Sequence, residues 1–133
     1  MYESIIKRHY DGLKAGQLRA HRCQSCQHLT YPMTTACENC ASSDYAEVTL
    51  ASEGSLLFAS HGASPPPHPR FARFAPYVYG HIKTADGVFL QAMIRGVEGT
   101  PEAVESLFAR LPAPVTLDVL ETEDLPVVAF KLA

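Results

Sequence analysis

The sequence predicts a mainly β protein in which an N-terminal helix and a short four-cysteine module precede a small barrel of five strands. Three observations support this fold class. All four cysteines fall into two C-x-x-C pairs within residues 23–40. From Tyr45 onward, apolar residues recur at every second position, which is the period of a β-strand. One helical pattern then separates a third strand from a fourth, which is the element order of an OB-fold; a different small β-barrel or a β-sandwich is the alternative.

The cysteine pairs are the most specific short motif in the chain. Cys23 and Cys26 form the first pair, and Cys37 and Cys40 form the second. Two residues between cysteines let a tight turn direct both sulfurs to one point, and two such turns supply the four thiolates that Zn²⁺ prefers. Iron accepts the same ligands, so the spacing alone leaves the metal open. Two disulfides, or unrelated thiols, are the non-metal alternatives.

A site closed by four cysteines is normally structural, because it leaves no open position for water or substrate. It also uses every thiol in the chain, so no cysteine is left as a nucleophile. The sequence contains no G-x-S-x-G, P-loop or H-E-x-x-H motif. We therefore expect no catalytic residues here, and no turnover by the chain alone.

Composition narrows the remaining classes. The chain has 133 residues, of which 47% are hydrophobic, and a net charge of −3. This acidic balance disfavours nucleic-acid binding, which usually needs a basic surface. No apolar run is long enough to cross a membrane, and the first residues do not form a signal peptide. With metal-type cysteines, these features predict a cytoplasmic location.

Residues 2–15 have the spacing of an amphipathic helix, with Gly16 suited to its C-cap. Its apolar face covers either the chain's own core or another protein. We divide the chain into this helix (1–17), a metal module (18–45) and an OB-fold domain (46–133). The expected apolar stripe consists of Tyr2, Ile5, Ile6, His9, Tyr10 and Leu13.

Inside the metal module, residues 18–22 and 29–32 are expected as short strands. The barrel region predicts a strand over 45–61 with a bulge at Gly54, and then a hairpin whose turn is Ala85-Asp86-Gly87. Thr100 is the expected N-cap of a helix that ends at Leu111. The remaining strands are expected at 77–84, 88–95, 115–121 and 127–132.

The loop after the first barrel strand alternates basic and aromatic residues. OB-folds commonly bind through this loop. Such residues suit stacked bases with phosphates, the adenine and phosphates of coenzyme A, or a protein interface. Packing of the phenylalanines beneath the loop is the alternative. The candidate ligand- or partner-binding residues are His68, Arg70, Phe71, Arg73 and Phe74.

Three segments together resemble one known family. They are residues 12–18 (GLKAGQL), the two cysteine pairs with Tyr31-Pro32 between them, and residues 75–78 (APYV). The chain resembles the zinc-ribbon/OB-fold proteins long labelled a domain of unknown function, which are often encoded beside thiolase-type genes. The resemblance covers nearly the whole chain, and its specific part runs from Gly12 to Cys40.

The resemblance implies a rubredoxin-like zinc ribbon with structural Zn²⁺, followed by an OB domain. It implies an accessory subunit of a thiolase, hydroxymethylglutaryl-CoA synthase, acetyltransferase or CoA-ester aldolase. It further implies a hetero-oligomer in which a thiolase-fold partner carries the catalytic residues and the acyl-CoA ester is a shared ligand. A nucleic-acid-binding zinc-ribbon/OB module is the alternative function, because both modules occur in nucleic-acid-binding proteins.

The sequence departs from the family pattern at two kinds of position. Gln27 and Ala41 stand where family members usually have glycine after each cysteine pair. A side chain at such a turn is expected to strain the backbone. The helix expected over residues 100–111 replaces a glycine-rich approach to the fourth strand, so family ligand contacts in that region do not carry over.

Overall fold

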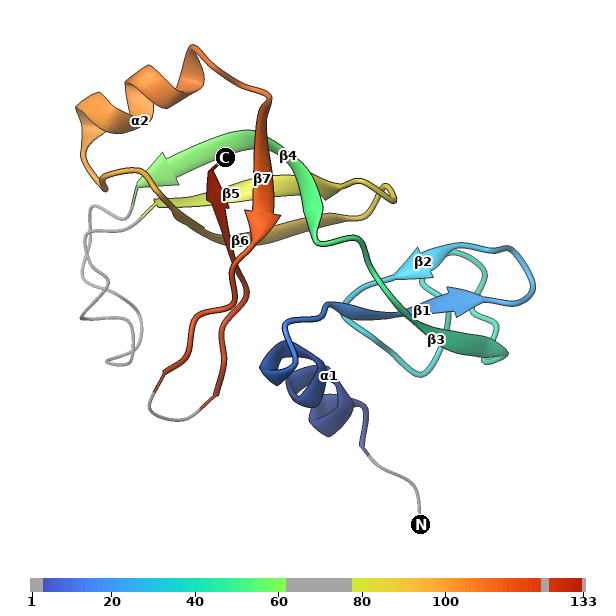
Figure 1. Cartoon of the computed structure of the whole chain (residues 1–133). Helices are drawn as coiled ribbons and strands as arrows, with labels where there is room; N and C mark the ends of the chain where they lie inside the picture. Colours follow the sequence, from blue (N-terminus) through green and yellow to red (C-terminus); the bar gives the residue numbers. More distant parts are fainter. Residues whose placement is uncertain (1–3, 62–77, 123–124, 133) are drawn as a thin grey trace.

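The computed structural model describes residues 4–61, 78–122 and 125–132. It contains an N-terminal helix, a three-stranded sheet that carries the cysteines, and a closed five-stranded barrel with a second helix (Figure 1). The cysteine sheet and the barrel lie side by side, and the first helix lies beside the connection between them (Figure 1). None of the helices in the described residues is long and apolar enough to cross a membrane.

Helix α1 spans Ile5–Lys14. It begins at Ser4, whose side-chain oxygen accepts a hydrogen bond from the Lys7 N–H at 3.1 Å, so one free N–H of the first turn is satisfied. Leu13 is buried in the core, whereas Ile6 is 70% exposed. The C-terminal half of α1 therefore packs on the chain's own core, and part of the predicted apolar stripe faces outward.

Two arginines, one in α1 and one in the first strand, meet the same carboxylate in the cysteine sheet. Arg8 of α1 donates to the Glu47 carboxylate through its Nε at 2.6 Å, and a second guanidinium nitrogen pairs with the same oxygen. Arg19 Nε lies 3.6 Å from the other Glu47 oxygen. These groups are partly exposed, so each pair contributes only about 0–1 kcal/mol. Their main effect is to position α1 and the first strand, because both arginines contact the same Glu47 carboxylate.

The cysteine sheet has the order β2-β1-β3 and is antiparallel. Strands β1 (Arg19–Cys23) and β2 (Leu29–Thr30) occur where the sequence predicted them. The strand expected over residues 45–61 is wrong, because it is two strands. β3 (Tyr45–Thr49) pairs with β1, and β4 (Glu53–His61) begins the barrel. The alternation continues across both strands, so it could not reveal that they pair with different partners.

The barrel has the strand order β4-β5-β6-β8-β7, and pairing of β4 with β7 closes it. Helix α2 (Pro101–Phe108) follows the third barrel strand and lies over β4 (Figure 1). This arrangement confirms the predicted five-stranded OB-fold with one helix. The other barrel strands are β5 (Val78–Thr84), β6 (Phe89–Arg95), β7 (Ala113–Leu117) and β8 (Ala129–Leu132).

The bulge of β4 lies between Leu56 and Phe58, three residues beyond its predicted site at Gly54. Gly54 has a different role, because a Cβ there would lie 2.6 Å from the Lys83 carbonyl oxygen. Glycine allows the two backbones to approach this closely. The bulge inserts an extra residue, so Leu57 and Phe58 are both exposed although they are consecutive.

The two local signals of the barrel region are confirmed. At the β5–β6 turn, Gly87 has a φ of +90° and donates its N–H to the Thr84 carbonyl at 2.9 Å; glycine adopts this backbone region most readily. At the start of α2, the Thr100 hydroxyl accepts from the Ala103 N–H at 3.2 Å. Pro101 occupies the first turn, where a missing N–H costs nothing.

One apolar core runs through the barrel and extends to α1 and the cysteine sheet. β5 alternates buried and exposed residues along its whole length, as predicted. Leu13, Leu18 and Leu50 belong to the same cluster as the barrel residues. The largest fully buried side chains are Phe130, Leu13, Leu18, Leu56, Ile82, Leu107, Val78, Val115 and Cys23.

The connection between the two sheets is held on both sides. The Leu50 N–H donates to the Leu18 carbonyl at 2.8 Å, so the start and the end of the cysteine sheet lie together. The Asp86 carboxylate accepts from the Ala51 N–H at 2.8 Å and from the Thr84 hydroxyl at 2.5 Å. Burial raises the pKa of Asp86, but these hydrogen bonds outweigh burial and lower the pKa below its ordinary value.

Candidate metal centre

The four cysteine sulfurs converge on one point. Their Sγ atoms all lie within 4.8 Å of one another. The Cys23–Cys40 sulfur distance is 3.5 Å, and the Cys26–Cys37 distance is 3.6 Å. A tetrahedral Zn²⁺ with Zn–S bonds of about 2.3 Å would place its sulfurs about 3.8 Å apart. The observed distances fit such an ion, and they are too long for disulfides, whose sulfurs lie about 2.0 Å apart.

Two equivalent turns bring the sulfurs together. In the first, the Gln27 N–H donates to the Cys23 carbonyl, and in the second the Ala41 N–H donates to the Cys37 carbonyl, both at 2.9 Å. Gln27 and Ala41 have φ values of +66° and +65°, a region that costs a residue with a side chain about 1–2 kcal/mol. These are the two positions at which the sequence predicted backbone strain, and both have the positive φ that causes it.

N–H groups surround the sulfurs. Cys23 Sγ accepts from the backbone N–H groups of Ser25 at 3.3 Å and Cys26 at 3.5 Å. Cys37 Sγ accepts from the Asn39 N–H at 3.4 Å. The Asn39 side chain crosses to the other turn, where its Nδ2 donates to Cys26 Sγ at 3.5 Å. Such donors stabilise thiolates, which are the form that binds a metal ion.

The thiol pKa values show why these sulfurs need a cation. The Cys26 N–H, with other donors, lowers the pKa of Cys23 to about 6. At Cys40 the Ser42 N–H lowers the pKa, but the adjacent sulfurs of Cys23 and Cys26 outweigh it and raise the pKa to about 12. Four neighbouring sulfurs cannot all be thiolates without a positive charge among them, and Zn²⁺ would supply that charge.

His28 lies beside the first turn but pairs elsewhere. Its Nε2 lies 2.7 Å from the Glu38 carboxylate, and both side chains are exposed. This contact joins the two turns outside the sulfur cluster. The predicted ligand set of Cys23, Cys26, Cys37 and Cys40 is therefore brought together by geometry without His28.

The second predicted site cannot be placed in the same way. His68, Arg70, Phe71, Arg73 and Phe74 all lie outside the described residues. Their assignment stays a prediction from the sequence.

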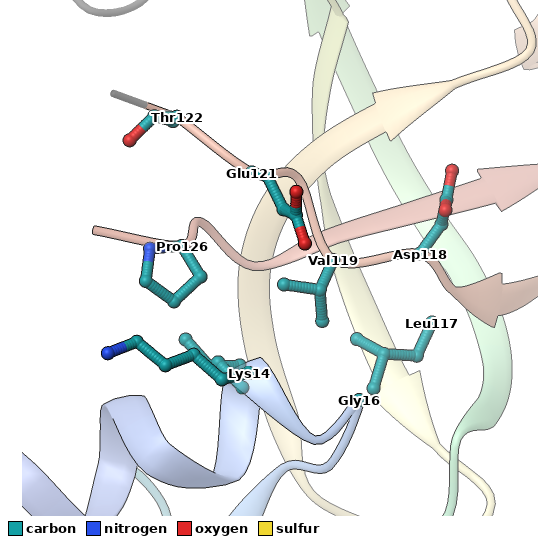
Figure 2. Close-up of a pocket in the computed structure, with 9 residues that line it drawn as sticks. Lys14, Gly16, Leu117, Asp118, Val119, Glu121, Thr122 and Pro126 are labelled. Carbon is teal, nitrogen blue, oxygen red and sulfur yellow. The ribbon is translucent and has the colours of Figure 1, made fainter. Parts of the chain in front are cut away.

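Two cavities lie where the barrel region meets α1 and the cysteine turns. One of about 540 Å³ lies between the end of α1 and the chain that follows β7, with Lys14 on one wall and Glu121 and Pro126 on the other (Figure 2). The other, of about 400 Å³, lies between the cysteine turns and the β5–β6 turn, with His28 and Phe89 among its walls. Sequence reasoning identified neither, because each combines segments far apart in the chain.

Sequence reasoning also missed Asn39, since an asparagine inside a C-x-x-C pair gives no signal of its direction. The sequence also did not reveal that the face of β5 that carries His81 lies beside the exposed phenylalanines of β4, β6 and α2. The pairing of these strands is not visible in a one-dimensional pattern.

The comparisons with known proteins agree with this geometry. Residues 11–46 match the domain family described as ChsH2, rubredoxin-like zinc ribbon domain. This segment contains all four cysteines, so the family match supports Zn²⁺ as a structural ion. No curated protein sequence matches the chain.

Solved structures are similar over nearly the whole chain. One is described as an Ltp2-ChsH2(DUF35) aldolase, with a TM-score of 0.74 and 27% identity over 98% of this chain and 96% of that chain. Another is a DUF35-family protein of unknown function from Sulfolobus solfataricus, with a TM-score of 0.60 and 14% identity over 97% and 85%. The second likeness shows the fold alone.

Proposed function

Because the chain is a zinc-ribbon/OB-fold protein of the DUF35 family, we propose that it is the non-catalytic accessory subunit of a thiolase-superfamily enzyme. In this role it supports the catalytic partner and helps to bind that partner's acyl-CoA substrate. The observation that carries the proposal is the likeness along both full lengths to the structure described as an Ltp2-ChsH2(DUF35) aldolase. The family resemblance of the sequence adds the thiolase-type partner.

The chemistry of the chain suits a supporting role. All four cysteines lie within one cluster, which leaves no thiol for acyl transfer. The cluster brings the end of β1 at Cys23 together with the two turns that carry the other cysteines. A bound Zn²⁺ would add cross-links that so small a sheet otherwise lacks.

The coenzyme A contact is the finer part of the proposal. Arg70 and Arg73 have the charge to meet phosphates, and Phe71 and Phe74 have the apolar area to meet adenine or an acyl chain. The support is their alternation in the sequence, together with the common use of this loop for binding in OB-folds.

The test is to purify the tagged full-length chain from its native host and identify the co-purifying protein by mass. We expect a thiolase-type enzyme in a fixed ratio, and acyl-CoA turnover by the complex but not by the chain alone. The proposal is overturned if no acyl-CoA enzyme co-purifies, or if the pure chain turns over acyl-CoA esters. Tight binding of a single-stranded oligonucleotide would instead support the alternative nucleic-acid function.

A further inference from the structure

Exposed aromatic side chains gather on one outer face of the barrel. Phe58 of β4 is 49% exposed, Tyr79 of β5 is 40%, Phe89 of β6 is 65%, and Phe108 of α2 is 44%. The three strands are neighbours in the barrel, in the order β4-β5-β6. These four residues are a majority of the exposed large apolar side chains in the described part of the chain. Their clustering on one face needs an explanation.

The side chains on this face form a connected row. The rings of Phe58 and Phe108 meet edge to face with centroids 5.4 Å apart, and Phe58 meets His81 in the same way at 5.9 Å. Gln91 Nε2 lies 2.9 Å from His81 Nε2, which extends the row to β6. The rings thus hold one another in place before anything binds, which lowers the entropy cost of association.

The face has a cation at one end. The Lys83 ammonium lies 5.5 Å from the centre of the Phe89 ring, and Lys83 pairs with Phe89 across the β5–β6 hairpin. No aspartate or glutamate occurs in residues 55–60, 79–83 or 89–93, although the chain has a net charge of −3. These stretches of β4, β5 and β6 therefore carry no acidic side chain, although the protein as a whole is acidic.

The other end of the face is hollowed and carries a carboxylate. A groove of about 370 Å³ lies between β4 and α2, and Phe58, Val104, Glu105 and Phe108 are among its lining residues. The groove exists because the β4 bulge exposes Phe58 beside Phe108. Bulges commonly redirect a side chain at a functional surface.

We propose that this face, which comprises Phe58, Tyr79, His81, Lys83, Phe89 and Phe108 and is called here the aromatic face, is the surface that binds the catalytic partner protein. The partner presents an apolar patch that fills the groove, a carboxylate opposite Lys83 and a basic side chain opposite Glu105. Aromatic residues at the centre with single charges at the edge are the usual composition of a protein interface. The inference rests on the proposed function, which supplies the partner.

The experiment measures binding of full-length variants to the partner isolated with the wild-type chain. Phe58→Ala and Phe89→Ala are each expected to weaken binding at least about tenfold, as the loss of an aromatic hot-spot residue does. Lys83→Glu is expected to slow association and to change its salt dependence. Leu125→Ala is the control, because it removes exposed apolar area between β7 and β8 and leaves the aromatic face intact. Thermal unfolding and zinc content establish that each variant is folded.

The outcomes separate this inference from the function on which it rests. If the wild-type chain brings down no acyl-CoA enzyme, both proposals are overturned. If the wild type binds the partner and folded Phe58→Ala and Phe89→Ala bind within twofold of it, only the aromatic face is overturned. The face is reassigned, and the inference overturned, if these variants abolish self-association or binding of a single-stranded oligonucleotide while partner binding is unchanged.

Discussion

The cysteine sheet and the barrel differ in what they bury. Phe130, Leu56 and Ile82 of the barrel are fully buried, whereas the largest fully buried side chain of the cysteine sheet's own strands is Cys23. The barrel therefore has the apolar area that stabilises an ordinary small domain. The cysteine sheet instead has four converging sulfurs, so its stability depends on the metal ion that they bind.

Replacing one sulfur should have the largest effect. Cys37→Ser is expected to unfold β1–β3 and leave the barrel folded, because structural Zn²⁺ contributes on the order of 10 kcal/mol to comparable small modules. Hydrogen exchange of backbone amides measures the two sheets separately. Thr35→Ala, an exposed change in the same module, is the control. Equal loss of protection in both sheets would show that they fold as one unit.

The converse variant tests the barrel. Phe130→Ala removes a fully buried ring and is expected to cost about 3–5 kcal/mol. The loss should appear as a lower unfolding midpoint of the barrel, with the metal retained until higher denaturant concentrations. A chromophoric chelator follows metal release in the same samples. Lys131→Ala, an exposed change on the same strand, is the control and should alter neither barrel unfolding nor metal release. If Phe130→Ala released its metal at the same denaturant concentration at which the barrel unfolds, the two sheets would not differ in what stabilises them.

Asn39→Ala tests the cysteine centre without removing a ligand. It deletes the side-chain donor to Cys26 Sγ, and loss of such an outer partner typically lowers metal affinity about 10–100-fold. Competition with a chelator of known affinity gives the value. Gln24→Ala changes an exposed residue of the first turn and should have little effect. Wild-type affinity in Asn39→Ala would mean that the backbone donors suffice.

The sequence predicted most of what is local in both regions. The Thr100 cap, the Asp86-Gly87 turn and the four cysteines each depend on a few neighbouring residues, and the structure places all of them as expected. The order of strands and helix also predicted the OB-fold. These signals are local because capping, turn geometry and ligand spacing act over only a few residues.

Long-range features were not predictable in the same way. Residues 45–49 pair with β1, and residues 53–61 pair with β5 and β7, yet both stretches have the same alternation. Gly54 resembled a bulge, but close approach of the Lys83 carbonyl accounts for it. The aromatic face combines side chains from β4, β5, β6 and α2, and only the closed barrel brings these elements together.

A smaller effect is expected from relief of backbone strain. Ala41 has a φ of +65°, so Ala41→Gly should remove about 1–2 kcal/mol of strain and add about 0.5–1 kcal/mol of unfolded-state entropy. The net expectation is a gain below about 1 kcal/mol, confined to the cysteine sheet and measured as slower metal release. Ala36→Gly, at a residue without positive φ, should be destabilising. A loss in Ala41→Gly would show that the turn is unstrained.

The smallest expected effect is a pH dependence at the contact of α1 with the cysteine sheet. The His9 ring lies 5.8 Å from the Tyr31 ring, and its buried Nδ1 has no hydrogen-bond partner. Burial lowers the pKa of His9 below its ordinary value of 6.5. The unfolded chain therefore binds this proton more readily than the folded chain does. The contribution of His9 is present above about pH 6.5 and is lost as the pH falls through the folded pKa.

His9→Gln isolates this contribution, because glutamine cannot titrate. The free energy of unfolding of wild type and variant is compared from pH 5 to pH 8. As the pH falls, the wild type should lose stability relative to the variant. Protonation of the cysteines affects both proteins and cancels in this difference. A difference independent of pH would mean that His9 is protonated equally in both states.

The hydrogen bond from Leu50 to Leu18 gives the cysteine sheet the topology of an insertion. The segment between residues 18 and 50 forms the whole cysteine sheet, and its two ends lie together because residues 18 and 50 are hydrogen-bonded. A short linker could therefore replace this segment and still join α1 to the barrel. In evolution, the cysteine sheet could be lengthened, exchanged or deleted without a change in the barrel, because insertions and deletions are best tolerated where the ends of a segment lie close together.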